Sequence, residues 1–126
     1  EVLSEGGRTG KIESANGKLS VQLSMDEKQD SLNSEHLFAG AYASCFLGAL
    51  LAAAEKASKP VKGATLKALV HLQEDASGGW QLAVELRATL PGMNRDEAEK
   101  LLHQAHTTCP YSKATRGNIN VTLHLD

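Results

Sequence analysis

The segment from Glu35 to about Ala57 limits the folds open to this chain more than any other feature. It is rich in Ala and Leu and nearly free of charge, and a helix that is apolar on all sides is typical of a buried, central position. Asn33 can cap its start, with Glu35 in the first turn, and Lys59-Pro60 ends the pattern. The sequence therefore predicts one long helix that the rest of the fold must cover.

Alternating apolar residues predict strands before and after this helix in the sequence. The Asn16-Gly17 pair has the backbone freedom for a tight hairpin turn, and Asn94 with Glu97 has the spacing of a helix-capping box. The expected elements are a hairpin over 10–24, a polar loop over 26–31, a second hairpin from 63–75 and 80–90, a helix from Asn94 to about His106, and a strand over 118–125. The order ββ-α-ββ-α-β predicts an α+β fold whose sheet covers the long helix.

The length of 126 residues predicts a single domain over 1–126, and no internal repeat or domain boundary interrupts it. A domain of this size buries roughly two-thirds of the surface of its unfolded chain, which allows a real core. One helix that is apolar on all sides is nevertheless hard to bury in so small a chain. We therefore expect a homodimer that packs two such helices together, and a stable monomer at micromolar concentration would contradict this expectation.

Charge and cysteine content narrow the classes of function. The net charge is −2 with both signs interspersed, so we expect neither a nucleic-acid partner nor a membrane partner. We expect no membrane span, because no apolar run reaches the required length, and no signal peptide at the start of the sequence. Two cysteines are too few for a disulfide framework, which favours a cytoplasmic location in a reducing environment.

The two cysteines lie far apart in the sequence and have different surroundings. Cys45 lies in the middle of the apolar helix, where a small buried core residue is the plain interpretation. Cys109 follows the second predicted helix in a polar turn and precedes Pro110, which fits either a presented thiol or a simple turn. Only the fold could bring the two sulfurs together, and the absence of a CxxC motif argues against a thioredoxin-like protein.

Three blocks of sequence carry a resemblance to a known family. They are GGRTG at 6–10, NSEHLFAGAYASCF at 33–46 and CPYSKATRGNINVTL at 109–123. In this order they resemble the organic hydroperoxide resistance (Ohr) branch of the OsmC/Ohr family, and the third block is the most specific of them. The resemblance implies an OsmC/Ohr-like fold, an intertwined homodimer with a long buried central helix, and a first family strand that is nearly absent before GGR.

The resemblance also implies an activity. Proteins of this branch reduce organic hydroperoxides to alcohols, and the family pattern implies Cys45 as the peroxidatic thiol and Cys109 as the resolving thiol. It implies Arg8 and Glu35 as the polar partners of the site. We expect no cofactor and no metal, and a dithiol reductant such as dihydrolipoamide or a lipoylated protein. In this cycle a sulfenic acid at Cys45 condenses with Cys109 to a disulfide, which the dithiol reduces.

The chemistry gives Arg8 a physical reason to be in the site. The attacking sulfur must be a thiolate, and a buried thiol resists ionisation. Cys45 lies too far from the start of its helix to gain from the helix dipole, so it needs a cation. Arg8 is permanently charged and presents a planar fork of donors, and the glycines around it allow a sharp turn. Taken alone, Arg8 would be interpreted as an exposed residue of a flexible loop.

Glu35 can hold Arg8 through paired hydrogen bonds, or it can simply be a carboxylate near the start of a helix. It lies ten residues before Cys45, which corresponds to roughly 15 Å along a straight helix. One arginine hardly bridges that distance within a single chain. We therefore expect the Arg8–Glu35 pair that serves a given Cys45 to come from the partner protomer, unless the helix bends or Arg8 spans much of the gap.

An apolar substrate pocket for an alkyl or aryl tail is expected around Cys45, with tyrosine side chains near its mouth. Its predicted residues are Leu37, Phe38, Ala41, Tyr42, Phe46, Leu50 and Tyr111. A stripe of this kind at helical spacing is more often ordinary core.

Two other kinds of function stay open. His103, His106 and Cys109 follow one another at three-residue spacing and could ligate a metal, although no fourth ligand is evident. A thiol redox sensor without catalysis, or a small-molecule binding protein of the same fold, is the other alternative. Such a protein would form the disulfide without multiple turnovers when a dithiol is supplied.

Overall fold

The computed structural model of the protein describes residues 1–28 and 30–126. Gln29, which belongs to the predicted polar loop over 26–31, lies outside the described residues. The chain divides into two compact units, Glu1–Phe38 and Ala39–Asp126, and each is described by itself. A single domain over 1–126 stays a prediction.

The first unit contains a small antiparallel sheet of the order β1-β2-β3. Its strands are β1 (Val2–Glu5), β2 (Lys11–Ser14) and β3 (Ser20–Gln22), and the short 3-10 helix η1 (Gly7–Thr9) joins the first two. The predicted hairpin of β2 and β3 is confirmed, with Gly17 at a φ of 70° in the turn. The sequence predicts the first strand to be nearly absent, but β1 pairs with β2 from Val2 opposite Ser14 to Glu5 opposite Lys11.

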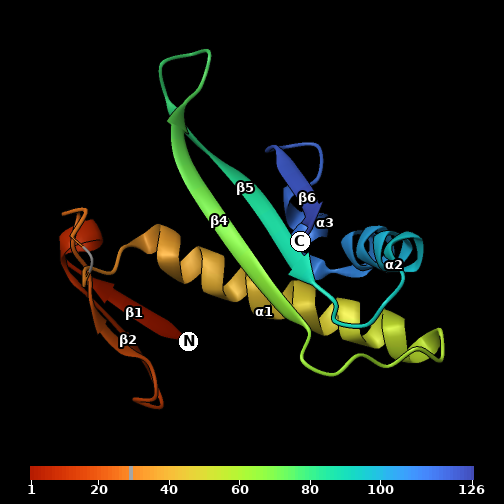
Figure 1. The fold of residues 1–126 in the computed structure, drawn as a ribbon. Helices are drawn as coiled ribbons and strands as arrows, with labels where there is room; N and C mark the ends of the chain where they lie inside the picture. The colour runs from red at the N-terminus through yellow and green to blue at the C-terminus, as the bar shows by residue number, and fades with distance from the viewer. Residues whose placement is uncertain (29) are drawn as a thin grey trace. The chain divides into compact units, whose positions relative to one another are not determined.

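The second unit contains a three-stranded sheet of the order β4-β5-β6 beside its helices (Figure 1). The elements are α1 (Ser34–Lys56), whose start belongs to the first unit, β4 (Thr65–Glu74), β5 (Trp80–Thr89), α2 (Arg95–Thr108), α3 (Pro110–Thr115) and β6 (Val121–Leu125). β4 and β5 form the predicted antiparallel hairpin, whereas β6 pairs with β5 in parallel. Parallel neighbours need a crossover connection, and α2 and α3 provide it. The α+β fold class is confirmed.

Both predicted helix caps are confirmed. Asn33 Oδ1 accepts a hydrogen bond from the backbone N–H of His36 at 2.9 Å, and His36 Nδ1 accepts one from the backbone N–H of Asn33 at 3.1 Å. Histidine thus takes the place of Glu or Gln in a reciprocal capping box. Asn94 Oδ1 accepts from the backbone N–H of Glu97, but the Glu97 carboxylate pairs with Lys59 and does not close the box.

Most buried apolar residues of the second unit come from one face of β5, one face of α2 and one stripe of α1. They include Val84, Leu86 and Ala88 on β5, Ala98, Leu101, Leu102 and Ala105 on α2, and Tyr42, Phe46, Leu50, Ala53 and Ala54 on α1. The sequence predicts that the long helix is buried, and within a single chain one stripe of α1 is buried. Leu51, beside that stripe, is 39% exposed.

By length and composition alone, α1 could also cross a membrane, which corrects the prediction that no segment is long enough. The apolar core helix of a globular protein passes the same test. Tyr42, Phe46 and Leu50 place one stripe of α1 in the core just described. Length and composition therefore carry no argument for a membrane span here.

Candidate functional site

The two cysteine sulfurs lie close together in the second unit. Sγ of Cys45, on α1, lies 3.6 Å from Sγ of Cys109, and both residues are free thiols. Cys109 is fully buried, whereas Cys45 is partly exposed. Bonded sulfurs are about 2.05 Å apart, so these two thiols are in contact but unbonded. The fold thus brings together two residues that lie far apart in the sequence.

A short helix, and not the predicted polar turn, follows Cys109. Pro110 occupies the first turn of α3, where its fixed φ and missing N–H are well tolerated. Cys109 has an extended backbone (φ −63°, ψ 125°) and flanks both α2 and α3. Its N–H donates to the carbonyl of Ala105 at 2.8 Å, and its carbonyl accepts from the N–H of Lys113 at 3.0 Å. The two helices therefore fix the backbone of Cys109 from both sides.

Burial raises the pKa of the Cys45 thiol above its ordinary value. The backbone N–H of Tyr111 acts in the opposite direction, because a donor to the sulfur stabilises the thiolate. This N–H lies in the first turn of α3, where backbone donors have no partner within the helix. The neighbouring Cys109 raises the pKa further, so these contributions together favour the neutral thiol at neutral pH.

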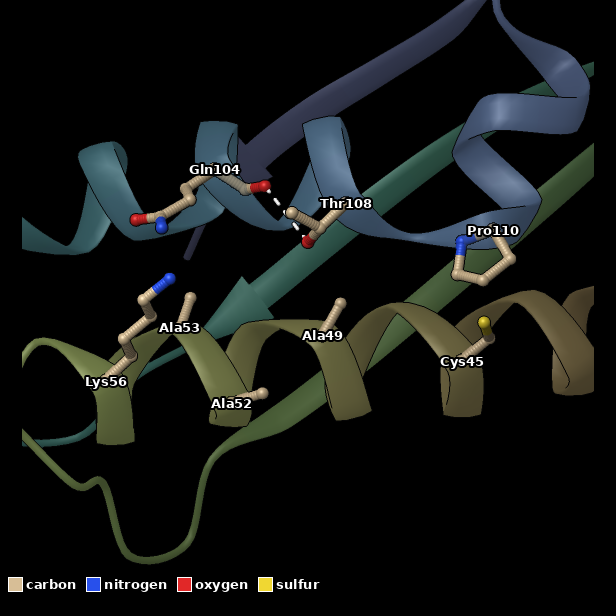
Figure 2. Close-up of a pocket in the computed structure, with 8 residues that line it drawn as sticks. All are labelled: Cys45, Ala49, Ala52, Ala53, Lys56, Gln104, Thr108 and Pro110. Carbon is tan, nitrogen blue, oxygen red and sulfur yellow. Dashed lines mark hydrogen bonds between the residues drawn. The ribbon is translucent and has the colours of Figure 1, made fainter.

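A pocket of about 370 Å³ opens beside Cys45, between α1 and α2 (Figure 2). Its lining consists of Cys45, Ala49, Ala52, Ala53, Lys56, Gln104, Thr108 and Pro110. Figure 2 shows Cys45 and Pro110 at one end and Lys56 and Gln104 at the other, with alanines of α1 between them. The volume is in the range of small-molecule sites. The thiol therefore adjoins a pocket that is apolar along α1 and polar at its far end.

Five of the residues predicted to form the substrate pocket do not line this one. Tyr42 and Phe46 are fully buried in the core, and Tyr111 is 38% exposed with its ring centroid 5.9 Å from that of Tyr42. Leu37 and Phe38 belong to the first unit. Within the described ranges, none of these five residues lines the pocket beside the peroxidatic candidate. Their contact with a substrate stays a prediction.

A buried hydrogen-bond network lies on the same three helices as the cysteines. Tyr42 Oη lies 2.9 Å from Ser112 Oγ and 3.1 Å from Thr115 Oγ1, and His106 Nδ1 lies 2.8 Å from Ser112 Oγ. Tyr42 and Ser112 have no exposed surface. Burial lowers the pKa of His106, and the charge of Arg116 lowers it further. The sequence did not reveal Ser112 and Thr115, because their shared face exists only once α3 is recognised as a helix.

The first unit holds the predicted ion pair. Arg8, on η1, has its Nη1 2.8 Å from Oε1 and 3.0 Å from Oε2 of Glu35, in the first turn of α1. The side chain of Glu35 is 14% exposed, but that of Arg8 is 46% exposed. The two residues thus pair as expected, with the guanidinium half exposed. Their part in catalysis stays a prediction.

The loop that carries Arg8 depends on its glycines. Gly6 and Gly7 have φ values of 77° and 62°, a region that other residues rarely adopt. A Cβ on Gly10 would lie only 1.7 Å from the carbonyl oxygen of Glu5. Side chains at these positions would therefore force the backbone around Arg8 to move.

The variant Gly10→Ala is expected to destabilise the first unit by about 2 kcal/mol or more, as overpacking does, and to displace Arg8. Gly17→Ala is the matched control, because Gly17 also has a positive φ, at 70°, but a Cβ added there would meet nothing within 4 Å. Its expected cost is about 1 kcal/mol. Thermal denaturation of both variants measures the difference, and equal losses would contradict the steric explanation.

A metal centre finds no support in this geometry. Among the described residues, no group of three or more His, Cys, Asp or Glu side chains could hold a metal ion. His106 Nδ1 contacts Ser112, and Cys109 Sγ contacts Cys45. The alternative in which His103, His106 and Cys109 act as ligands is therefore not pursued.

The comparisons with known proteins agree in sequence and in fold. A family profile described as OsmC-like protein matches residues 26–124, a range that contains Glu35 and both cysteines but not Arg8. An organic hydroperoxide resistance protein of Xanthomonas axonopodis pv. citri (strain 306) is 40% identical over 126 residues, which cover 95% of this chain and 88% of that protein.

Two further comparisons concern Bacillus subtilis (strain 168). Its organic hydroperoxide resistance protein OhrB is 36% identical over 129 residues, which cover 99% of this chain and 95% of that protein. A crystal structure of the organic hydroperoxide resistance protein OhrB of Bacillus subtilis matches the fold with a TM-score of 0.94 and 38% identity, over 100% of this chain and 96% of that chain. The similarity thus extends over nearly the whole chain.

Proposed function

The chain belongs to the OsmC-like family and, within it, to the organic hydroperoxide resistance proteins, and we propose that it is a cysteine-based peroxidase that reduces organic hydroperoxides to alcohols. Its relatives support a role in resistance to organic hydroperoxides. The observation that carries the finer proposal is the 3.6 Å contact between the sulfurs of Cys45 and Cys109. A pocket-facing thiol in contact with a buried one fits a peroxidatic and a resolving cysteine.

In the proposed cycle, the Cys45 thiolate attacks the outer oxygen of the hydroperoxide. The O–O bond breaks, the sulfur keeps that oxygen as a sulfenic acid, and the remaining oxygen takes a proton and leaves as the alcohol. The thiol of Cys109 then attacks the sulfenic sulfur, so that the S–S bond forms and water leaves. A dithiol reduces this disulfide by exchange and returns both cysteines to thiols.

Arg8 and Glu35 are the polar partners in this proposal. The guanidinium would stabilise the thiolate and the leaving oxygen, and the carboxylate would hold the guanidinium. The resemblance in residues 6–10 and 33–46 and the ion pair between Arg8 and Glu35 support these roles. The proposal includes a homodimer, because α1 is apolar well beyond its one buried stripe.

The reductant is proposed to be a small or tethered dithiol, with dihydrolipoamide or a lipoylated protein as the candidate from the family resemblance. Cys109 is fully buried, whereas Cys45 adjoins the pocket, so attack on the disulfide would occur at the sulfur of Cys45. A flexible dithiol can enter such a pocket more easily than a cysteine on a folded protein surface. The cycle requires a compartment that keeps dithiols reduced, such as the cytoplasm.

Steady-state turnover tests this function. Cumene hydroperoxide and hydrogen peroxide are each supplied with dihydrolipoamide or with thioredoxin and its reductase. We expect many turnovers with dihydrolipoamide, at least about tenfold slower turnover with thioredoxin, and a preference for cumene hydroperoxide because alanines line much of the pocket. Consumption of one equivalent of hydroperoxide and no more, with every dithiol, would indicate a redox sensor in place of an enzyme.

A further inference from the structure

We propose that the hydroxyl groups of Tyr42 and Ser112 position the two thiols for the second step of this cycle, the formation of the disulfide. They belong to the buried network that joins α1, α2 and α3, the helices that carry or flank the two cysteines. The inference rests on the proposed peroxidase function and assigns these hydroxyl groups a positioning role in its second step.

Tyr42, His106 and Ser112 each lie three residues from one of the two cysteines. Tyr42 lies three residues before Cys45 on α1, which puts it on the same side of the helix one turn earlier. His106 lies three residues before Cys109, near the end of α2, and Ser112 lies three residues after it, on α3. One set of hydrogen bonds therefore ties together the backbone segments that set the distance between the sulfurs.

One order of donors satisfies all the hydrogen bonds of the network. The hydroxyl of Thr115 donates to the backbone carbonyl of Ser112 at 3.2 Å, so its oxygen accepts the proton of the Tyr42 hydroxyl. The Tyr42 oxygen then accepts from the Ser112 hydroxyl, whose oxygen accepts from Nδ1–H of His106. Nδ1 carries a proton in this tautomer and also in the imidazolium, so the network does not depend on the charge of His106.

Burial makes the network selective for one arrangement of the helices. Every buried polar side-chain atom in the described part of the chain has a hydrogen-bond partner. A buried hydroxyl that loses its partner costs more than the hydrogen bond itself contributed, because water cannot replace it. Movement of α3 away from α1 would break the contact between Ser112 and Tyr42 and is therefore disfavoured.

The second step is the one that depends on this arrangement. The sulfurs must approach from 3.6 Å to about 2.05 Å when the disulfide forms. The sulfenic acid of Cys45 has a competing reaction, in which a second hydroperoxide oxidises it to the sulfinic acid and leaves as alcohol. A thiol held in place reacts as if its concentration were very high. The position of Cys109 therefore decides whether disulfide formation is faster than oxidation to the sulfinic acid. The first step depends on the thiolate, its pocket and the proposed polar partners Arg8 and Glu35, and it does not require the two sulfurs to approach each other.

The variants Tyr42→Phe and Ser112→Ala test the inference, and Tyr42→Phe keeps the packing of the ring. Each protein receives excess cumene hydroperoxide, and mass spectrometry measures the ratio of sulfinic acid to disulfide. We expect this ratio to rise about fivefold, the effect of one lost hydrogen bond. Because Tyr42→Phe keeps the ring, and with it any apolar contact with a substrate, consumption of the first equivalent should stay within about twofold of the original rate. Ser44→Ala is the control, because this exposed hydroxyl bonds only the carbonyl of Ala41 on its own helix, and its ratio should not change.

The possible results are distinct. A higher ratio in Tyr42→Phe with an unchanged first step supports the inference, whether or not Ser112→Ala folds. An unchanged ratio, or a loss of both steps in proportion to a lowered Tm, would overturn it and leave the peroxidase function standing. If hydroperoxide oxidises neither Cys45 nor Cys109 in the original protein, the proposed function itself fails, and the inference fails with it.

Discussion

Replacement of Cys45 by serine is expected to abolish the reduction of organic hydroperoxides, with a loss of about four orders of magnitude or more. A serine hydroxyl does not ionise near neutral pH, so it is a poor nucleophile toward the O–O bond. It also cannot hold the transferred oxygen in a sulfenic acid that a second thiol can reduce. Consumption of cumene hydroperoxide with dihydrolipoamide as the reductant measures the loss.

Cys109→Ser is the matched control for this prediction, because it removes the other half of the contact between the sulfurs. We expect this variant to consume the first equivalent of hydroperoxide and then to accumulate sulfenic or sulfinic acid at Cys45. Mass spectrometry of the intact protein distinguishes these products from a disulfide. Normal turnover by Cys45→Ser, or a first equivalent consumed by Cys45→Ser but not by Cys109→Ser, would show that the roles are assigned wrongly.

The regular elements could be predicted because their signals are local. Asn33 and Asn94 each offer a side-chain oxygen to backbone N–H groups of the next turn, and the structure contains both caps. The alternating apolar residues of 80–90 predict a strand, and the structure contains it as β5. Its Val84 and Leu86 pair with residues of β4 on one side and of β6 on the other. The capping asparagines and the alternation of apolar residues can both be recognised without knowledge of contacts with distant parts of the chain.

The segment after Cys109 could not be predicted in the same way. Pro110 favours an extended residue before it, which fits a turn as well as the first turn of a helix. A helix of only six residues has little stability of its own, and the contacts of Ser112 and Thr115 with Tyr42 on α1 hold it. Those contacts join residues that are distant in the sequence, so no local pattern contains them.

The candidate site was likewise predictable only in part from the sequence. The resemblance named Cys45 and Cys109, and the distance of 3.6 Å between their sulfurs required the fold. The pocket beside Cys45 is lined by alanines, Lys56 and Gln104 among others, which the sequence pattern did not predict. Large aromatic side chains such as Tyr42 fill the core because their burial removes the most apolar area from water, whereas small alanines leave room for a pocket.

Replacement of Arg8 by alanine is expected to lower the rate of hydroperoxide reduction about 100-fold near neutral pH, as the loss of one stabilising charge does in other active sites. Burial holds the pKa of Cys45 above its ordinary value, and only a small part of a thiol with a raised pKa is thiolate at neutral pH. A cation lowers that pKa, so its removal moves the rise of the pH–rate profile to higher pH. Part of the lost activity should therefore return in alkaline solution.

Arg8→Lys provides the control for charge alone. Lysine keeps the positive charge but lacks the planar fork of donors that can bind a carboxylate and a peroxide oxygen together. We expect a pH–rate profile close to the original and an intermediate rate, measured with cumene hydroperoxide from about pH 6 to pH 10. If Arg8→Ala leaves both the rate and the profile unchanged, the thiolate is stabilised in another way and Arg8 belongs only to its surface ion pair with Glu35.

Mixed dimers decide whether Arg8 serves Cys45 of its own chain or of a partner. Chains with Cys45→Ser and chains with Arg8→Ala have low activity alone, for different reasons. In a mixed dimer with sites shared between chains, Arg8 of the first chain meets Cys45 of the second, so that one of two sites is complete and about half of the activity returns. With sites inside each chain, no complete site exists and no activity returns. Sedimentation of the same samples must show dimers, because a stable monomer would leave no partner to supply the arginine.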